Sequence, residues 1–300
     1  MKEVIRRIKT FASIHPEPEK HPESWFLQEL KEFSEKGNLV LHEVYEQAGK
    51  VDHRSIFRYS GKGDLLAEIL YKADGTLWET TTYIRGKKGR LDEIHHQYED
   101  GSSTVTRVSY QNHTEEIRIL DEEGSLDSLT KKKFDLDGNL IEEILLNEQE
   151  EIEQQLQFSY DEEGRLTERL DIDAKNEVQI KYSLRYDERG NLATKLGITQ
   201  EGKIAERYSY LYDREGRLVE ERENGLVVQY SYDQEGKCVK EETLNAQGVP
   251  EATRHFRYNK EGLLSGSFSY QTGDQYEIEP QVVARTKPSY LSTRIEYEYF

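Results

Sequence analysis

A 26-residue repeat constrains this chain more than any other feature of its sequence. Three segments, Tyr160–Leu166, Tyr186–Leu192 and Tyr212–Leu218, share the pattern Tyr-Asp-x-x-Gly-x-Leu and follow one another at this constant spacing. A fixed period of this length is typical of proteins that stack one small structural unit many times. The sequence therefore predicts one continuous repeat array.

Evenly spaced turn residues divide each repeat into two strands. Glycine or asparagine occurs at positions 37, 49, 63, 75, 89, 101, 112, 124, 138, 164, 176, 190, 202, 216, 225, 236, 248, 262 and 273, mostly in alternating 12-residue and 14-residue steps. A polar turn without glycine is expected near residue 150. Asn224–Gly225 ends a shorter interval, which predicts a hairpin shorter than its neighbours.

The two kinds of step predict two kinds of turn. At the 12-residue steps, two-residue hairpin turns are expected, because their central residues require positive φ. They are Asp74–Gly75, Asp100–Gly101, Lys175–Asn176, Glu201–Gly202 and Gln247–Gly248. At the 14-residue steps, Asp-x-x-Gly predicts a type I turn that ends in a left-handed glycine, with the aspartate accepting backbone N–H bonds.

Between the turns, apolar and polar residues alternate, as they do in strands that are buried on one face. Val178, Ile180 and Tyr182 share one face of their segment, whereas Gln179 and Lys181 share the other. We therefore predict an all-β antiparallel meander of about 21 strands over residues 37–300. At ~4.8 Å per strand the ribbon would be on the order of 100 Å long. Its apolar face favours curling into a spiral or barrel-like shell.

The segment 1–36 lacks the repeat, and its apolar spacing predicts a small helical cap. Val4, Ile5, Ile8 and Phe11 follow one helix face, and the prolines of 15–22 interrupt it. A second helix is expected over 23–36, with Trp25, Phe26, Leu30 and Phe33 on its apolar side. We expect this helix to plug or cap the interior of the array. The domains are thus 1–36 and 37–300.

The C-terminal region departs from the regular pattern. Pro280 interrupts an expected strand, and Lys287–Pro288 falls where the next turn is due. Residues 294–300 read as a final strand whose charges would protect an exposed edge.

Composition limits the classes of partner. The 59 acidic and 41 basic residues give a formal net charge of -18, which opposes binding to nucleic acid and to anionic membrane surfaces. The N-terminus lacks the apolar run of a signal peptide, and no stretch approaches ~20 apolar residues. We expect a cytoplasmic protein. The single cysteine, Cys238, excludes an internal disulfide.

No pattern of residues indicates catalysis. Seven of the eight histidines lie between His15 and His113, but their spacing matches no known set of metal ligands. Acidic neighbours such as Glu142 and Glu143 point to opposite faces of a strand. The motifs of phosphate loops and nucleophile elbows are missing. We therefore expect a protein without enzymatic activity, metal or cofactor.

Tyrosines are the remaining candidates for binding, since the chain has 20 of them. The candidate partner-binding residues are Tyr182, Tyr186, Tyr208, Tyr210 and Tyr212. They could line a surface that contacts a sugar or an apolar segment of another protein. The alternative is that they are core residues of a wide sheet.

The segments 160–166 and 212–218 read Tyr-Asp-x-x-Gly-Arg-Leu, which resembles the YD repeat of rearrangement-hotspot (Rhs) and teneurin-type proteins. Degenerate copies at 134–140, 232–237 and 258–263 extend the resemblance over roughly residues 37–270. In that family, such repeats form a β-shell that encloses a toxin polypeptide. This chain is shorter and lacks a recognisable self-cleaving segment and a C-terminal toxin domain.

The repeat architecture favours a non-enzymatic scaffold that binds another protein. By resemblance, its setting would be a bacterial toxin or secretion locus, with the chain acting as immunity protein, antitoxin or carrier. A carbohydrate-binding module that uses a face of exposed tyrosines is the first alternative. An enzyme with its site near Asn224 or at the junction of helix and sheet is the second.

Overall fold

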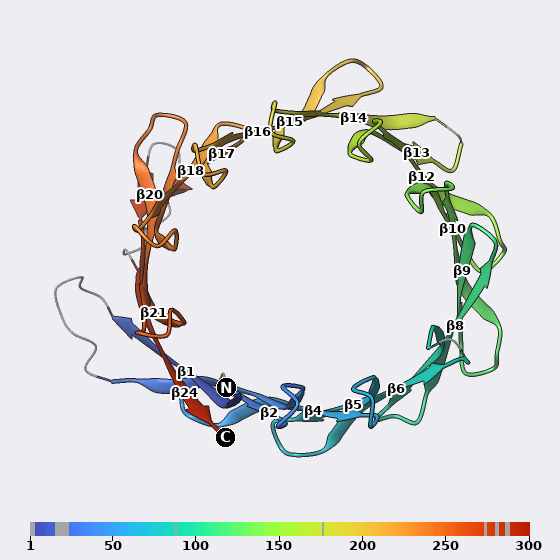
Figure 1. Cartoon of the computed structure of the whole chain (residues 1–300), viewed down its shortest axis with the longest axis horizontal. Helices are drawn as coiled ribbons and strands as arrows, with labels where there is room; N and C mark the ends of the chain where they lie inside the picture. Colours follow the sequence, from blue (N-terminus) through green and yellow to red (C-terminus); the bar gives the residue numbers. More distant parts are fainter. Residues whose placement is uncertain are drawn as a thin grey trace. The chain divides into compact units, whose positions relative to one another are not determined.

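The computed structural model describes residues 4–15, 24–87, 89–175, 177–272, 275–279, 282–285 and 289–300. These residues form 24 β-strands and no helix (Figure 1). No helix in the described ranges could therefore span a membrane. The chain divides into two compact units. Unit 1 comprises Met1–Ile56, Lys72–Gly75 and Tyr210–Phe300, and unit 2 comprises Phe57–Tyr71 and Thr76–Ser209.

Unit 2 is an antiparallel meander in which each strand pairs with the next along the chain. Its strands are β5 (Leu65–Lys72), β6 (Leu77–Arg85), β7 (Leu91–Tyr98), β8 (Ser103–Gln111), β9 (Thr114–Leu120), β10 (Leu126–Phe134), β11 (Leu140–Leu146), β12 (Ile152–Tyr160), β13 (Leu166–Asp173), β14 (Val178–Tyr186), β15 (Leu192–Thr199) and β16 (Ile204–Tyr212). The last residues of β16 belong to unit 1.

Unit 1 contains both ends of the chain. Its strands are β1 (Ile5–His15), β2 (Phe26–Phe33), β3 (Leu39–Tyr45), β4 (Val51–Tyr59, shared with unit 2), β17 (Leu218–Glu223), β18 (Leu226–Tyr232), β19 (Cys238–Leu244), β20 (Pro250–Tyr258), β21 (Leu264–Gln271) and β24 (Ser289–Tyr299). The strands β22 (Gln275–Glu279) and β23 (Val282–Arg285) form a separate hairpin. Strand β24 pairs with β21 on one side and with β1 on the other (Figure 1).

These pairings confirm the predicted all-β antiparallel meander. The C-terminal segment is indeed the final strand, but it has no exposed edge to protect. Glu298 of β24 accepts a hydrogen bond from Lys9 (2.6 Å) and one from Arg7 (3.0 Å), both on β1. The predicted interruptions at Pro280 and Lys287–Pro288 lie outside the described residues.

The predicted N-terminal helices are wrong. Residues 5–15 form β1 and residues 26–33 form β2, and the two strands pair with each other. Arg7 of β1 lies between Glu32 of β2 and Glu298 of β24 and hydrogen-bonds to both. Strand partners from opposite ends of the sequence decide this conformation, and local apolar spacing does not reveal them. No helix is therefore present in the described residues to plug or cap the array.

The Asp-x-x-Gly turns form as predicted. In the turn at 161–165, the Gly164 N–H donates to the carbonyl of Asp161 (3.0 Å), and Gly164 has φ of 75°. The Asp161 carboxylate accepts the backbone N–H groups of Glu163 (3.1 Å) and Arg165 (2.8 Å). This geometry is a type I turn followed by a left-handed residue, which suits the twist of the flanking strands.

The prediction of a second, tighter kind of turn is wrong at most of the 12-residue steps. The N–H of Gly202 donates to the carbonyl of Thr199 (2.9 Å), and the N–H of Thr199 donates to the carbonyl of Lys203 (2.8 Å). Gly75, Gly101 and Gly248 likewise bond to carbonyls three residues earlier. The glycine is therefore the last residue of a four-residue turn at both ends of the strands. Asn176 lies outside the described residues.

Of the turns that differ from this rule, two were indicated by the sequence. Asn224 (φ 48°) and Gly225 (φ 98°) form a two-residue turn between the register partners Glu223 and Leu226. This confirms the shorter hairpin. At the glycine-free turn near residue 150, Glu150 takes the left-handed position with φ of 59°.

The repeat tyrosine links one hairpin to the preceding one. The Tyr186 hydroxyl donates to the carbonyl of Leu166 (2.8 Å), and the Arg165 guanidinium lies 4.9 Å from the Tyr186 ring centre. Tyrosines at the same position make the same hydrogen bond: Tyr160 to Leu140, Tyr232 to Leu218 and Tyr258 to Cys238. We call this hydrogen bond the tyrosine latch.

The left-handed conformation of Glu150 generates a stability prediction. Glu150→Gly should raise the free energy of unfolding by roughly 0.5–1 kcal/mol. Glycine removes steric strain of about 1–2 kcal/mol, and the greater backbone entropy of the unfolded chain offsets part of this gain. The exposed contact of Glu150 with Arg118, at 3.9 Å, contributes little. Urea denaturation measures the change.

The matched control is Glu148→Gly in the same turn, at a position where φ is not positive. This variant should lose about 0.5–1 kcal/mol, because glycine there gives only greater freedom to the unfolded chain. Equal shifts in both variants would contradict the assignment of strain to Glu150.

The tyrosine latch generates a second prediction. Tyr186→Phe should lower the free energy of unfolding by about 1 kcal/mol, because it leaves the Leu166 carbonyl without its donor. Tyr59→Phe is the matched control: Tyr59 ends β4 as Tyr186 ends β14, and its hydroxyl makes no hydrogen bond within the described residues. The prediction fails if urea denaturation shows equal effects for the two variants.

Candidate binding surface

Tyr182, at the middle of β14, lies in a cluster of charged side chains in unit 2. Register pairing places Arg169 of β13 and Gly197 of β15 directly opposite Tyr182 on the same side of the sheet. We call this side of β12–β16 within unit 2 the tyrosine face. The Arg169 guanidinium is 5.0 Å and the Lys195 ammonium 4.6 Å from the Tyr182 ring centre.

Hydrogen bonds connect the charged side chains of the cluster to one another and to Tyr182. Arg169 donates two bonds of 2.6 Å to the carboxylate of Asp171. Glu206 accepts a bond from the Tyr182 hydroxyl (3.1 Å) and one from Lys195 (3.2 Å). Burial and the Glu206 carboxylate raise the pKa of Tyr182.

Gly197 provides the space that the Tyr182 ring occupies. A Cβ atom at Gly197 would lie 2.8 Å from Cε1 of Tyr182, which is too close for any other residue without movement of the ring. Tyr182 is only 5% exposed. Its ring therefore supports the surface from beneath, and the charged groups above it face outward.

The other four predicted tyrosines have different environments. Tyr186 forms a tyrosine latch and is half-buried. Tyr208 is half-buried on β16, with Lys195 4.8 Å from its ring centre. Tyr210 and Tyr212 are half-buried and belong to unit 1. Burial and the charge of Glu221 raise the pKa of Tyr210. The structure thus brings Tyr182 and Tyr208 together around Lys195.

Exposed apolar residues occur at the same place in successive repeats, on the side of the sheet opposite the tyrosine face, because the register shifts pair Ile204 with Ile198 and Val178 with Ile172. Ile152 begins β12 and is 41% exposed, and Ile204 begins β16 and is 53% exposed. Val178 occupies the same position in β14 and is half-buried. We call Ile152, Val178 and Ile204 the apolar row. The 26-residue period could have identified this row, because its members are one period apart.

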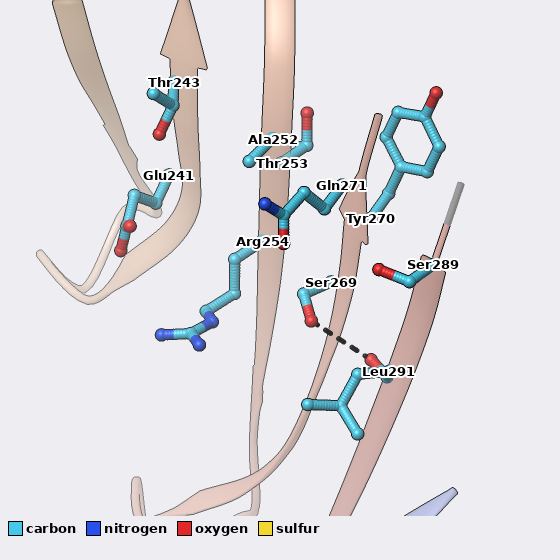
Figure 2. Close-up of a pocket in the computed structure, with 10 residues that line it drawn as sticks. All are labelled: Glu241, Thr243, Ala252, Thr253, Arg254, Ser269, Tyr270, Gln271, Ser289 and Leu291. Carbon is cyan, nitrogen blue, oxygen red and sulfur yellow. Dashed lines mark hydrogen bonds between the residues drawn. The ribbon is translucent and has the colours of Figure 1, made fainter. Parts of the chain in front are cut away.

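A hollow of about 310 Å³ lies against β19, β20, β21 and β24 in unit 1 (Figure 2). Its polar lining residues include Glu241, Thr243, Arg254, Gln271 and Ser289. The sequence analysis did not identify this group, because its residues belong to four strands spread over about fifty residues and carry no motif. We call it the polar hollow.

A second cavity, of about 470 Å³, is lined by Phe268, Tyr270 and Tyr290 together with Lys240, Glu242, Thr253 and His255. The ring centres of Tyr270 and Tyr290 are 5.0 Å apart, and those of Phe268 and Tyr290 are 6.2 Å apart. Lys240 donates a 2.8 Å hydrogen bond to Glu242. We call it the aromatic cavity.

Several histidines lie beside carboxylates. His42 is 2.8 Å from Glu29, and His96 is 2.7 Å from Glu79. His53 is 2.8 Å from Asp52, its neighbour in sequence. Among the described residues, no three histidine, cysteine or acidic side chains are placed to hold a metal ion.

The sequence matches the family model described as Teneurin YD-shell over residues 28–250. No curated protein has a sequence that matches this chain.

Solved structures with a similar arrangement are distant in sequence. The structure titled TcdB2-TccC3-TEV has 12% identity and a TM-score of 0.30, with 90% of this chain and 19% of that chain covered. The structure titled TcdB2-TccC3-Cdc42 has 14% identity and a TM-score of 0.32, with 91% and 16% covered. This chain thus spans less than a fifth of each of those two chains.

A porin-like protein from Bacteroides uniformis ATCC 8492 has 9% identity and a TM-score of 0.35, with 98% of each chain covered. The family match covers more than half of the sequence, includes the copies of Tyr-Asp-x-x-Gly-x-Leu at 160, 186 and 212, and confirms the resemblance to YD repeats. The chain therefore belongs to the Teneurin YD-shell family.

Proposed function

We propose that this chain is a non-enzymatic scaffold that binds another polypeptide along the apolar row of unit 2. The observation that carries the proposal is the apolar row, whose Ile152 and Ile204 remain 41% and 53% exposed. Exposed aliphatic side chains in a regular row are a feature of protein-binding surfaces.

The chemistry beside the row suits a polypeptide. Lys181 forms an ion pair with Glu168 on the same side of the sheet as the row, so this surface offers both signs of charge. An extended chain presents apolar side chains, backbone carbonyls and N–H groups together, which match such a mixed surface. The net charge of -18 favours a neutral or basic partner.

Membership of the YD-shell family supports a toxin-associated setting for this scaffold. Rhs-type repeats, which this sequence resembles, enclose a toxin polypeptide. We propose a role as immunity protein, antitoxin or carrier for such a polypeptide, in the cytoplasm of a bacterium.

The test is affinity capture from the source cells with the full chain as bait, followed by quantitative mass spectrometry. The double variant Ile152→Glu/Ile204→Glu should reduce enrichment of the partner by at least about tenfold, because it places charge where apolar contacts form. Leu136→Glu is the matched control, since Leu136 is 88% exposed in a turn away from the row. Recovery of no protein, or equal recovery with both variants, would overturn the proposal.

Carbohydrate binding is a second candidate, and the aromatic cavity favours it. Tyr270 and Tyr290 lie beside Glu242, His255 and Lys240, so that apolar rings and hydrogen-bonding groups share one cavity, as sugar recognition requires.

A glycan array probed with the full chain tests this candidate. Tyr290→Ala should abolish the signal, because it removes a ring of the cavity, whereas Tyr110→Ala in unit 2 should leave the signal unchanged. An array without any bound glycan would eliminate carbohydrate binding.

A further inference from the structure

The polar hollow gathers side chains from four neighbouring strands of unit 1 onto one side of the sheet. Glu241 of β19 is the register partner of Arg254 of β20, and Gln271 of β21 is the register partner of Ser289 of β24. Figure 2 shows these side chains around the hollow. Its volume of about 310 Å³ lies at the lower end of the range for small-molecule sites.

The two charged residues of the hollow face each other across the strands without forming an ion pair. In the described part of the chain, Arg254 has no carboxylate partner, and its guanidinium lies 5.9 Å from the Phe256 ring centre. Arg54 and Glu43 occupy the same direct cross-strand register in unit 1, and their side chains do pair, at 2.5 Å. The separation of Glu241 and Arg254 is therefore a local feature and not a consequence of the register.

Among the described residues, no cation pairs with the negative charge on the Glu241 side of the hollow. Tyr230 of β18 is the register partner of Glu241. Burial and the charges of Glu221 and Glu241 raise the pKa of Tyr230 to about 12. A cationic group of a ligand would be attracted to this side. On the other side, the Arg254 guanidinium is a donor fork suited to a carboxylate.

From this arrangement we propose that the polar hollow binds a free α-amino acid. The ligand's carboxylate would bind Arg254 and its ammonium group would bind Glu241. The Gln271 amide and the hydroxyls of Ser289 and Thr243 supply further hydrogen bonds, and Leu291 provides apolar contact for the ligand's side chain.

The pair of charges selects for a zwitterion. A simple anion would be attracted by Arg254 but repelled by Glu241, and a simple cation would experience the reverse. Only a ligand with both charges gains from both residues. This ligand differs from the polypeptide proposed for unit 2, so the two proposals stand or fall separately.

The test uses the full chain, with L-leucine as probe in calorimetric and NMR titrations. Its analogues 4-methylpentanoate and 3-methylbutylamine each lack one of the two charged groups. L-leucine should bind at least about tenfold more tightly than either analogue, and the NMR shifts should concentrate on β19, β20, β21 and β24.

Variants assign the contacts. Arg254→Gln and Glu241→Gln should each weaken L-leucine binding by at least about tenfold. Arg257→Gln is the matched control, because Arg257 is exposed on the opposite side of the same strand. Circular dichroism checks that each variant is folded. Absence of saturable binding up to the solubility of leucine, equal affinity for an analogue, or unchanged affinity of the two hollow variants would overturn the proposal.

Discussion

The hydrogen bond from the repeat tyrosine to a carbonyl of the preceding repeat is the side-chain interaction that ties successive hairpins together. An isolated two-stranded hairpin is marginally stable in water, so each hairpin needs its neighbours. The latch from Tyr186 to Leu166 adds a side-chain bond to the backbone ladder, and Arg165 packs on the same ring. Tyr297 of β24 makes the same kind of bond to the carbonyl of Leu264, so the terminal strand is held as the repeats are.

The motif residues are used for structure, which leaves the middle of each nine-residue strand free to carry different chemistry. The fifth residue of such strands is Leu156 in β12, Tyr182 in β14, Tyr208 in β16 and Arg254 in β20. The same scaffold position therefore supports the charged cluster in unit 2 and contributes the Arg254 guanidinium of the polar hollow in unit 1. Binding properties of a repeat of this kind are best sought at this position.

The shortage of fully buried side chains explains why many of these positions are polar. Among the described residues, the buried hydrophobic side chains are Ala12, Ile69, Leu129, Leu146, Ile172 and Tyr182. With so little apolar burial, stability must come largely from the backbone ladder, the turns and pairs such as Arg169 with Asp171. Two of the tyrosines that were predicted to bind a partner contribute to stability in this way. Tyr182 is buried beneath Arg169 and Lys195, and Tyr186 forms a tyrosine latch.

The sequence by itself determined the repeat, the strands and the turns, because the information for them is local. A glycine at most of the 12-residue and 14-residue steps sets where the chain reverses, an aspartate three residues before many of the glycines at the 14-residue steps completes the turn, and alternation between turns defines a strand. Only the backbone geometry shows that the turns at both ends of the strands are of the same kind and that Glu150 is left-handed. Residues 5–15 and 26–33 are strands because β24, from the other end of the chain, supplies the edge that β1 needs. Likewise, only the tertiary structure shows that Glu241 lies opposite Arg254 without an ion pair, since side-chain direction depends on packing that the local sequence does not determine.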